Sequence, residues 1–336
     1  MDLKTTTLDP LINLTRKENG NKDLESFAHH VAAGLSQPPK KLSSRYFYDG
    51  PGSALFQQIM ELPEYYPTRC EYEVLTDNKA AITAHLAKKG FFHLIDLGAG
   101  DALKTKILLK ELQERQILFD YLPVDISEDA MQQLSSSLEK EMPELNHQAI
   151  VGDYDDSLGW LQHNKTGRKV ILFLGSNIGN FEHEESLDFL SKVRSHLEPG
   201  DSLLLGIDLR KDPDKILSAY NDSAGVTAAF NLNLLHRINR ELGGDFDVNG
   251  FFHYPIYNPQ EGVMRSYLVS KQEQNVFIQA TGKSFHFSAW EAIHTESSYK
   301  YTLPQIQAMA EASGFIMEIV FQDNQGCFAD VIFKAV

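Results

Sequence analysis

Apolar and polar residues follow two rhythms along this chain, and the change between them marks its elements. Between residues 71 and 210, short apolar runs typical of buried strands alternate with segments whose apolar residues recur every three or four positions, as in amphipathic helices. This alternation predicts a doubly wound α/β domain with a parallel sheet covered on both faces. The predicted strands are FFHLIDLGAG, FDYLPVDIS, HQAIVGDY, KVILFLGSNIGN and DSLLLGIDL, and the predicted helices are EYEVLTDNKAAITAHLA, ALKTKILLKELQER, EDAMQQLSSSLEKEM and EESLDFLSKVRSHL.

The rhythm changes after residue 211. One long helical stretch is predicted for DKILSAYNDSAGVTAAFNLNLLHRINREL, followed by antiparallel strands in FFHYPIYN, GVMRSYLVS, QNVFIQA and SFHFSAW. The chain then returns to a helix and two strands. The first 70 residues are polar, and then rich in tyrosine and turn residues. We therefore predict two domains, one formed by residues 71–210 with 301–336 and a second, α+β domain formed by residues 1–70 with 211–300.

Composition narrows the class of function. The 336 residues include 31 basic and 46 acidic side chains, and the formal charge of −15 argues against a nucleic-acid or membrane partner and favours a small-molecule substrate. Cys70 and Cys327 are too few and too far apart in sequence to suggest a disulfide framework or a thiolate metal site, so no metal is expected. We expect neither a secretory leader nor a membrane-spanning helix, because residues 1–27 show no basic segment followed by an apolar run and no later segment reaches about 18 uninterrupted apolar residues. We expect a cytoplasmic protein, and a monomer.

A glycine turn gives the sharpest local signal. In LIDLGAGDALKT, residues 94–105, an apolar strand leads into Gly98 and Gly100, which lets backbone approach a ligand closely at the carboxyl end of the strand. A plain strand-to-helix turn is the alternative. Leu103 stands where a dinucleotide fingerprint has its third glycine, so a nicotinamide or flavin site loses support.

Acidic residues end the next two predicted strands. Asp125 follows one strand, where a carboxylate can accept both hydroxyls of a ribose, and Asp153 with Tyr154 follows the next, where they suit an adenine amino group and ring. Each aspartate alone is more often a helix cap. Together with the glycine turn, they give a layout that resembles a class I S-adenosylmethionine methyltransferase.

Longer motifs carry a closer resemblance. They are YFYDGPGSALFQQIMELPEYYPTRCEYEVL, FLGSNIGNF, DLRKD, AYNDSAGVTAAFNLNLLHRINREL and HTESSYKY. These motifs resemble the ergothioneine-biosynthetic histidine Nα-methyltransferase family over nearly the whole chain, from about residue 30 to the end. The resemblance implies a class I methyltransferase domain, a second substrate domain, and three methyl transfers from S-adenosylmethionine to the α-amino group of histidine, which give hercynine.

The resemblance also implies roles for individual residues. Tyr48 and Tyr65 would line the substrate site, where aromatic faces suit an amine that ends as a permanent cation. A packing role is the alternative for this Tyr-rich stretch. Tyr48 and Asn180 are the predicted catalytic residues, and Gly98, Gly100, Lys104, Asp125, Asp153 and Tyr154 the predicted cofactor residues. The predicted substrate residues are Tyr48, Tyr65, Gly175, Asn180, Tyr220, Met264, Glu296 and Ser298, with Asn180 on the head group, Tyr220 on the carboxylate, and Glu296 and Ser298 on the imidazole.

Three points stay open. A register shift of two would place Ser266 beside the substrate ring in place of Met264, which would weaken specificity for histidine. A methyltransferase of the same family that acts on another amino acid, such as tryptophan, is therefore one alternative. A binding or regulatory protein that has lost activity is another, but Asp125, Asn180 and Tyr220 are all present.

Overall fold

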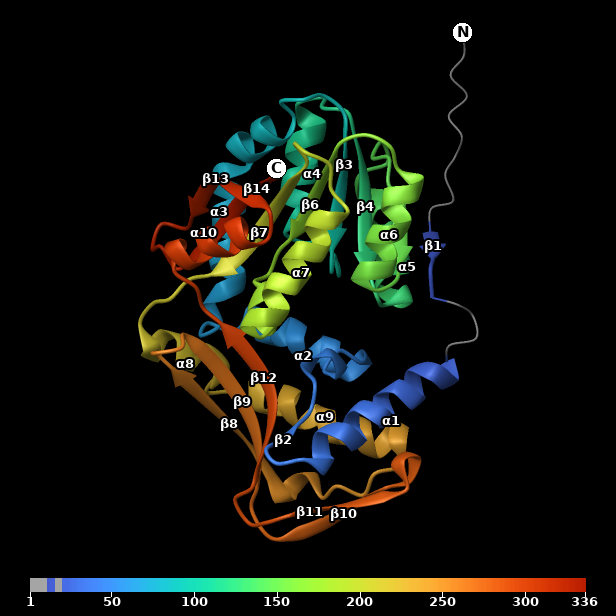
Figure 1. Ribbon diagram of the computed structural model, residues 1–336, viewed down its shortest axis with the longest axis vertical. Coiled ribbons are helices and arrows are strands. Elements are labelled where there is room, and N and C mark those ends of the chain that lie inside the picture. Colours follow the sequence, from blue (N-terminus) through green and yellow to red (C-terminus); the bar gives the residue numbers. More distant parts are fainter. Residues whose placement is uncertain (1–10, 16–19) are drawn as a thin grey trace. The chain divides into compact units, whose positions relative to one another are not determined.

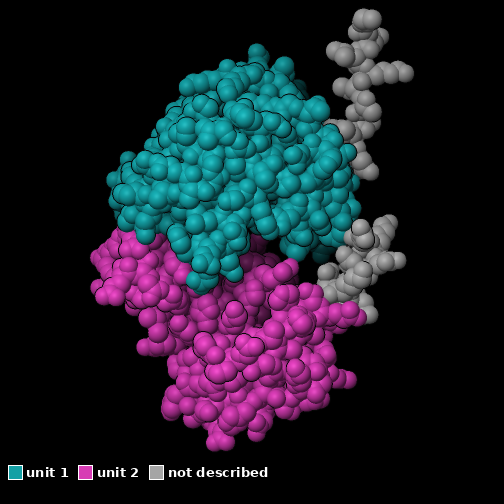
Figure 2. Space-filling view, in the orientation of Figure 1, with its two compact units in different colours: residues 1–16, 69–209, 301–336 teal, residues 17–68, 210–300 magenta. Residues whose placement is uncertain are grey.

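The computed structural model describes residues 11–15 and 20–336 of the chain. The chain divides into two compact units, coloured in Figure 2. Unit 1 comprises residues 1–16, 69–209 and 301–336, and unit 2 comprises residues 17–68 and 210–300. Each unit has its own buried apolar core.

An eight-stranded sheet forms the centre of unit 1 (Figure 1), in the order β1-β5-β4-β3-β6-β7-β14-β13. The six strands from β1 to β7 in this order run parallel, and β14 pairs antiparallel with both β7 and β13. The predicted α/β class with a doubly wound, mainly parallel sheet is confirmed. The strands are β1 (Leu11–Asn13), β3 (Phe92–Leu97), β4 (Phe119–Asp125), β5 (Ala149–Val151), β6 (Lys169–Phe173), β7 (Ser202–Asp208), β13 (Phe315–Gln322) and β14 (Phe328–Ala335).

The burial of the central strands explains why the sequence pattern predicts them. Every residue of β3, β6 and β7 is buried, as expected for central strands of a sheet that is covered on both faces. The helices of unit 1 connect these strands. They are α3 (Tyr66–Leu86), whose first residues belong to unit 2, α4 (Thr105–Glu114), α5 (Glu128–Glu141), α6 (Tyr154–Asn164), α7 (His183–Ser195) and α10 (Leu303–Ala312), with the 3₁₀ turn η2 (Asn177–Asn180). Apolar residues of α3, α4 and α5 join the same core as the strands.

Unit 2 is an α+β assembly. Its four-stranded sheet has the order β2-β12-β9-β8, and β10 and β11 form a separate antiparallel pair. Helices α8 and α9 pack against β8 and β9. The strands are β2 (Lys40–Lys41), β8 (Phe251–Asn258), β9 (Val263–Ser270), β10 (Gln274–Ile278), β11 (Lys283–Phe287) and β12 (Ala292–Tyr299); the helices are α1 (Gly20–Ser36), α2 (Gly50–Glu61), α8 (Pro213–Tyr220) and α9 (Val226–Leu242), with 3₁₀ turns η1 (Ser44–Tyr46), η3 (Val248–Gly250) and η4 (Gln279–Thr281).

The prediction of one continuous helical stretch from about residue 214 to 242 is wrong. The chain leaves the helix after Tyr220, and Gly225 adopts a positive φ of 73° before α9 begins. The Asp222 carboxylate accepts hydrogen bonds from the backbone nitrogens of Val226 and Thr227, both at 2.8 Å, and so satisfies the first amides of α9. Among the described residues, no helix is long and apolar enough to cross a membrane.

Candidate active site

The glycine turn after β3 needs backbone that other residues adopt poorly. Gly98 has a φ of +74° and Gly100 a φ of +54°. A Cβ atom on Gly98 would lie 2.9 Å from the Tyr154 hydroxyl oxygen, which is closer than real Cβ contacts come. Steric space and dihedral angle therefore both require glycine at residue 98.

Asp125 ends β4 and contacts this turn. Its Oδ2 accepts a hydrogen bond from the Gly100 backbone nitrogen at 3.2 Å, and its Oδ1 accepts one from the Ser127 nitrogen at 2.9 Å. Burial raises the pKa of this carboxyl above its ordinary value. An ionised carboxylate has about four acceptor positions, so each oxygen of Asp125 can still accept from a ligand hydroxyl.

Asp153 and Tyr154 differ in their surroundings. The exposed Asp153 is the N-cap of α6, and its Oδ1 accepts a hydrogen bond from the Asp156 nitrogen at 2.8 Å. The half-buried Tyr154 ring makes edge contacts with Phe173 and Phe189, with centroids 5.7 and 5.8 Å apart. Burial raises the pKa of the Tyr154 phenol, so it stays neutral at physiological pH.

Glu71 on α3 connects two predicted site residues and was not predicted itself. Its carboxylate is fully buried, forms an ion pair with Lys104, and accepts a hydrogen bond from the Gly175 nitrogen at 2.6 Å. Gly175, with a φ of +80°, lies against the same lysine, since a Cβ there would be 3.2 Å from Lys104 Nζ. The buried Asp330 carboxyl lies nearby, and burial followed by the charge of Glu71 raises its pKa well above the ordinary value.

Another buried acidic residue, Asp96, helps to position the glycine turn. Asp96, the fifth residue of β3, accepts hydrogen bonds from the Thr105 hydroxyl at 2.7 Å and the Tyr121 hydroxyl at 2.8 Å. Burial raises the pKa of Asp96 to about 6. These bonds fix the strand to the start of α4 and so position the glycine turn between them.

In unit 2, the predicted tyrosines form one aromatic chain. Tyr48 contacts Phe56 edge-on at 5.5 Å, Phe56 contacts Tyr65 at 6.3 Å, and Tyr65 contacts Tyr220 at 6.3 Å between ring centroids. Tyr48 is 46% exposed, whereas Tyr220 is buried. Phe56, which links the series, was not singled out from the sequence.

Tyr220 leads to the predicted imidazole readers on β12. The Tyr220 hydroxyl lies 2.8 Å from the Ser298 hydroxyl, and Met264 of β9 is paired with Ser298. Glu296 is on the same face of β12 and is paired with Ser266. Met264 and Ser266 therefore both face the residues that are predicted to bind the imidazole. The sequence left open which of the two lies beside the substrate ring, and in the structure they are neighbours on the same face of β9.

Two polar side chains on the paired strands β9 and β12 have no hydrogen-bond partner among the described residues. The Glu296 carboxylate accepts none, and burial raises its pKa to about 7, while the positive charge of Lys300 acts in the opposite direction. The buried Ser266 hydroxyl also lacks a partner there. Each group can therefore form a further hydrogen bond.

The predicted site residues divide between the two units. Within each unit most of them are linked by the contacts given above, whereas Asp153 serves as a helix cap and Asn180 ends η2 half-buried. A charged residue on the apolar stripe of α3 could have indicated Glu71, and the alternation of residues 296, 298 and 300 could have indicated Lys300. Unit 1 holds Gly98, Gly100, Lys104, Asp125, Asp153, Tyr154, Gly175 and Asn180, and unit 2 holds Tyr48, Tyr65, Tyr220, Met264, Glu296 and Ser298.

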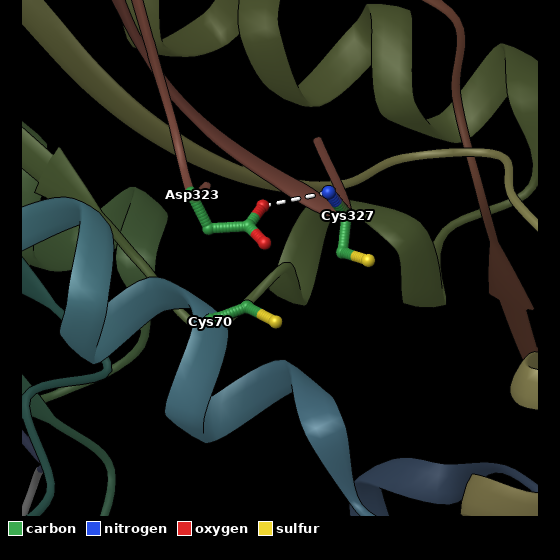
Figure 3. Close-up of side chains that lie close together, drawn as sticks. All are labelled: Cys70, Asp323 and Cys327. Carbon is green, nitrogen blue, oxygen red and sulfur yellow. Dashed lines mark hydrogen bonds between the residues drawn. The ribbon is translucent and has the colours of Figure 1, made fainter. Parts of the chain in front are cut away.

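The two cysteines are close in space, contrary to what their sequence separation suggested. Figure 3 shows Cys70 of α3 beside Asp323 and Cys327 of the β13–β14 connection, and one ligand atom from each lies within 4.8 Å of the others. The Asp323 Oδ1 already accepts hydrogen bonds from the nitrogens of Cys327 at 2.6 Å and Phe328 at 2.7 Å. These bonds shape the tight connection, so the cluster has a structural explanation without an ion.

Comparison with known proteins agrees with the geometry. The family profile described as histidine-specific methyltransferase, SAM-dependent, matches residues 27–335. The histidine N-alpha-methyltransferase of Mycolicibacterium smegmatis is 38% identical over 304 residues, covering 90% of this chain and 93% of that protein. That of Mycobacterium tuberculosis is 37% identical over 298 residues, covering 89% and 91%. Ergothioneine biosynthesis protein 1 of Neurospora crassa is 28% identical over 287 residues, covering 82% and 31%. The chain therefore belongs to the family of histidine-specific, S-adenosylmethionine-dependent methyltransferases.

Proposed function

We propose that this methyltransferase transfers three methyl groups in succession to the α-amino group of L-histidine, giving hercynine as a step of ergothioneine biosynthesis. The best support from the site is the unpartnered carboxylate of Glu296 on the same face of β12 as the Ser298 hydroxyl. A carboxylate accepts an imidazole N–H, and a hydroxyl can donate to the other ring nitrogen. The relatives named histidine N-alpha-methyltransferase and ergothioneine biosynthesis protein 1 support the same substrate and pathway.

The residues of unit 1 fit S-adenosylmethionine, whose sulfonium provides an electrophilic methyl group. Asp125 keeps acceptor positions for ribose hydroxyls, and the glycine turn lets backbone approach the ligand. Lys104 would pair with the methionine carboxylate, and Tyr154 would contact the adenine ring. Asp153 would add an acceptor at its second carboxylate oxygen.

The protein's remaining task is to hold an unprotonated amine in line with the methyl group. In our proposal Asn180 and Tyr48 orient this nitrogen, and Gly175 allows close backbone approach. The rings of Tyr48 and Tyr65 attract the growing cation without requiring a proton to bond. Phenols with ordinary pKa values near 10 are poor bases at neutral pH, so each proton is released to water.

A substrate screen tests the proposal. The purified protein is incubated with S-adenosylmethionine and each common amino acid in turn, and products are followed over time by mass spectrometry. We expect mono-, di- and trimethylated histidine to appear in sequence, with the trimethylated form as the end product. Methylation of a different amino acid, or termination at one methyl group, would contradict the proposal.

One observation favours a second candidate, an N-methyltransferase of the same family for another amino acid such as tryptophan. The Ser266 hydroxyl is buried, lacks a partner among the described residues and faces Glu296 across the strand pair. A small polar residue beside the ring leaves room that a larger aromatic substrate could fill. Greater turnover of tryptophan than of histidine in the same screen would favour this candidate.

A further inference from the structure

Gly206, the fifth residue of β7, leaves a space into which two buried carboxyl groups point. A Cβ atom on this glycine would lie 2.2 Å from Glu71 Oε1 and 3.1 Å from Asp330 Oδ1, and the first distance is shorter than real Cβ contacts. Glu71 comes from α3 and Asp330 from β14, where it is paired with Gly206. Both acids are fully buried. Distant segments of the chain therefore bring two carboxyl groups to one point inside unit 1.

The two acids differ in their hydrogen bonds. Glu71 forms the ion pair with Lys104 and accepts from the Gly175 nitrogen, whereas neither carboxyl oxygen of Asp330 has a partner among the described residues. A buried carboxylate without a partner is costly, but a protonated carboxyl is neutral and has an O–H to donate. Burial, followed by the charge of Glu71, raises the pKa of Asp330, while Lys104 acts in the opposite direction. Asp330 therefore favours its protonated form.

Glu71 is the acceptor beside that proton. A carboxylate has about four acceptor positions, and Lys104 and the Gly175 nitrogen use two of them. With a proton from Asp330, three donors converge on one carboxylate. The negative charge of Glu71 then balances the positive charge of Lys104, and Asp330 is neutral. Two ionised acids would instead leave a buried negative charge that repels an anionic ligand.

Lys104 is the member of this cluster that can reach a ligand. Its side chain is 23% exposed, whereas that of Glu71 is 1% exposed. Within the described part of the chain, Glu71 accepts the one hydrogen bond that the Lys104 ammonium donates, so two of its three protons remain for a ligand. A lysine side chain is long and flexible, and an ammonium that is already held costs less to order when the ligand binds.

We propose that Glu71 is a positioning residue for S-adenosylmethionine, which acts through Lys104 and is itself held by a proton from Asp330. The inference rests on the contact proposed between Lys104 and the methionine carboxylate, and not on the identity of the methyl acceptor. Glu71 fixes the ammonium before the cofactor binds. Its hydrogen bond from Gly175 ties the connection after β6 to the same carboxylate.

The test measures binding of S-adenosylhomocysteine and of 5′-methylthioadenosine, which keeps the adenosine and the sulfur but lacks the amino-acid end. Calorimetry gives both dissociation constants for wild type, Glu71→Gln, Lys104→Met and the double variant. No methyl acceptor is present, so the result is independent of the substrate screen. Asp77→Asn, an exposed acid on α3, is the matched control. Binding of 5′-methylthioadenosine also shows that a variant is folded.

We expect Glu71→Gln to weaken binding of S-adenosylhomocysteine by about 10- to 30-fold, because a lysine that is no longer held must be ordered by the ligand. Binding of 5′-methylthioadenosine should change by less than about threefold, and Asp77→Asn should change neither. Removal of the Glu71 charge alone would strengthen the attraction between Lys104 and an anion, so a loss of affinity distinguishes positioning from charge. Glu71→Asp keeps the charge but is one methylene shorter. It should show the same loss, and it replaces Glu71→Gln if that variant does not fold.

The proton on Asp330 has its own measurement. Asparagine has the shape of a protonated carboxyl and can donate from its amide, so Asp330→Asn should bind both ligands within about threefold of wild type. At neutral pH, infrared spectra of wild type should contain the carbonyl band of a protonated carboxyl that Asp330→Asn lacks. Identical spectra in this region would show that Asp330 is ionised and would overturn its part in the proposal.

The role of Glu71 would be overturned by any of three results. Unchanged or stronger binding of S-adenosylhomocysteine in Glu71→Gln would exclude positioning, and equal losses for both ligands would show a purely structural role. In the Lys104→Met background, which should itself weaken binding of S-adenosylhomocysteine, Glu71→Gln should have little further effect. A further loss as large as that in wild type would show that Glu71 does not act through Lys104.

Discussion

For Tyr48, a predicted catalytic residue, the roles of the ring and of the hydroxyl can be distinguished by one substitution. Its ring packs against Phe56 and Phe230 while 46% of the residue stays exposed. Phenylalanine keeps this packing and the aromatic face but removes the hydroxyl that we propose aims the amine. In our proposal the ring contributes to binding and the hydroxyl to orientation of the amine.

We expect Tyr48→Phe to bind histidine within about tenfold of wild type, yet to methylate more slowly and to accumulate mono- and dimethylated histidine, because misorientation lowers the rate of transfer more than binding. Mass spectrometry over time measures the product ratio. Tyr46→Phe is the matched control, because the Tyr46 hydroxyl bonds His30 at 2.9 Å, away from the aromatic chain. A Tyr48 variant that runs to the trimethylated product at an unchanged rate would remove the phenol from the mechanism.

At the scale of elements, positive φ angles at Gly98, Gly100 and Ala102 constrain the turn between β3 and α4. We expect Gly98→Ala to lower S-adenosylmethionine affinity by at least about tenfold, because its Cβ would meet Tyr154 and its φ of +74° is unfavourable for alanine. Gly90→Ala is the control, with a φ of +86° but nothing within 4 Å of the added carbon. It should cost about 1 kcal/mol of stability and leave cofactor affinity unchanged. Equal affinity in both variants would contradict a cofactor role for the turn.

Element patterns in the sequence predicted much of the fold because the central strands β3, β6 and β7 are buried throughout and the helices are amphipathic. They failed where the determinant is not periodic. The three residues of β1 form a strand only because they pair with β5. Helix α6 was not predicted, because it begins with acidic residues that are also typical of a turn. The break between α8 and α9 depends on one Asp222 side chain and a positive φ at Gly225.

Motif and strand end coincide at Gly98, which follows β3, and at Asp125, which ends β4, whereas Glu296 lies within β12. Residues that act through a distant partner could not be identified from one sequence. Glu71 pairs with Lys104, 33 residues away, and Lys300 bonds Tyr220, 80 residues away. Local pattern shows only that each is a charge at a buried position, and it is the fold that gives the charge its partner.

At the scale of the whole molecule, the buried Asp96 links global stability to pH. Burial raises the pKa of Asp96 to about 6 in the folded protein, against about 3.9 in an unfolded chain, while the hydrogen bonds from Thr105 and Tyr121 act in the opposite direction. Between these pH values the folded state binds more protons than the unfolded state. The contribution of Asp96 to the free energy of unfolding therefore falls by about 2 kcal/mol as pH rises from about 4 to about 6, and becomes negligible above about pH 7.

Asp96→Asn cannot ionise, so the variant should lack this fall. Urea unfolding of both proteins between pH 4 and pH 7 measures the difference, and wild type should lose about 2 kcal/mol relative to the variant over that range. Asp188→Asn, at an exposed position of α7, is the control and should change little. A wild-type to Asp96→Asn difference that is the same at every pH would show that Asp96 does not titrate in this range.

The division of predicted site residues between the units gives the last prediction. Asp125, in unit 1, is proposed to bind the cofactor ribose, and Glu296, in unit 2, the substrate ring. We expect Asp125→Ala to weaken S-adenosylmethionine binding by about 1.5 to 3 kcal/mol, the scale of a lost charged hydrogen bond. Glu296→Ala should lower histidine turnover about 100-fold and leave cofactor binding nearly intact, because Glu296 is proposed to bind the imidazole and not the methyl donor.

Calorimetry and steady-state rates measure the two effects, with Glu184→Ala and Glu273→Ala as exposed acidic controls in unit 1 and unit 2. Unchanged cofactor affinity in Asp125→Ala would exclude Asp125 from the cofactor site. Wild-type histidine turnover in Glu296→Ala would mean that another group reads the imidazole. If instead Glu296→Ala weakened cofactor binding as strongly as Asp125→Ala, the two ligands would not be read by separate residues, and assigning one ligand to each carboxylate would be wrong.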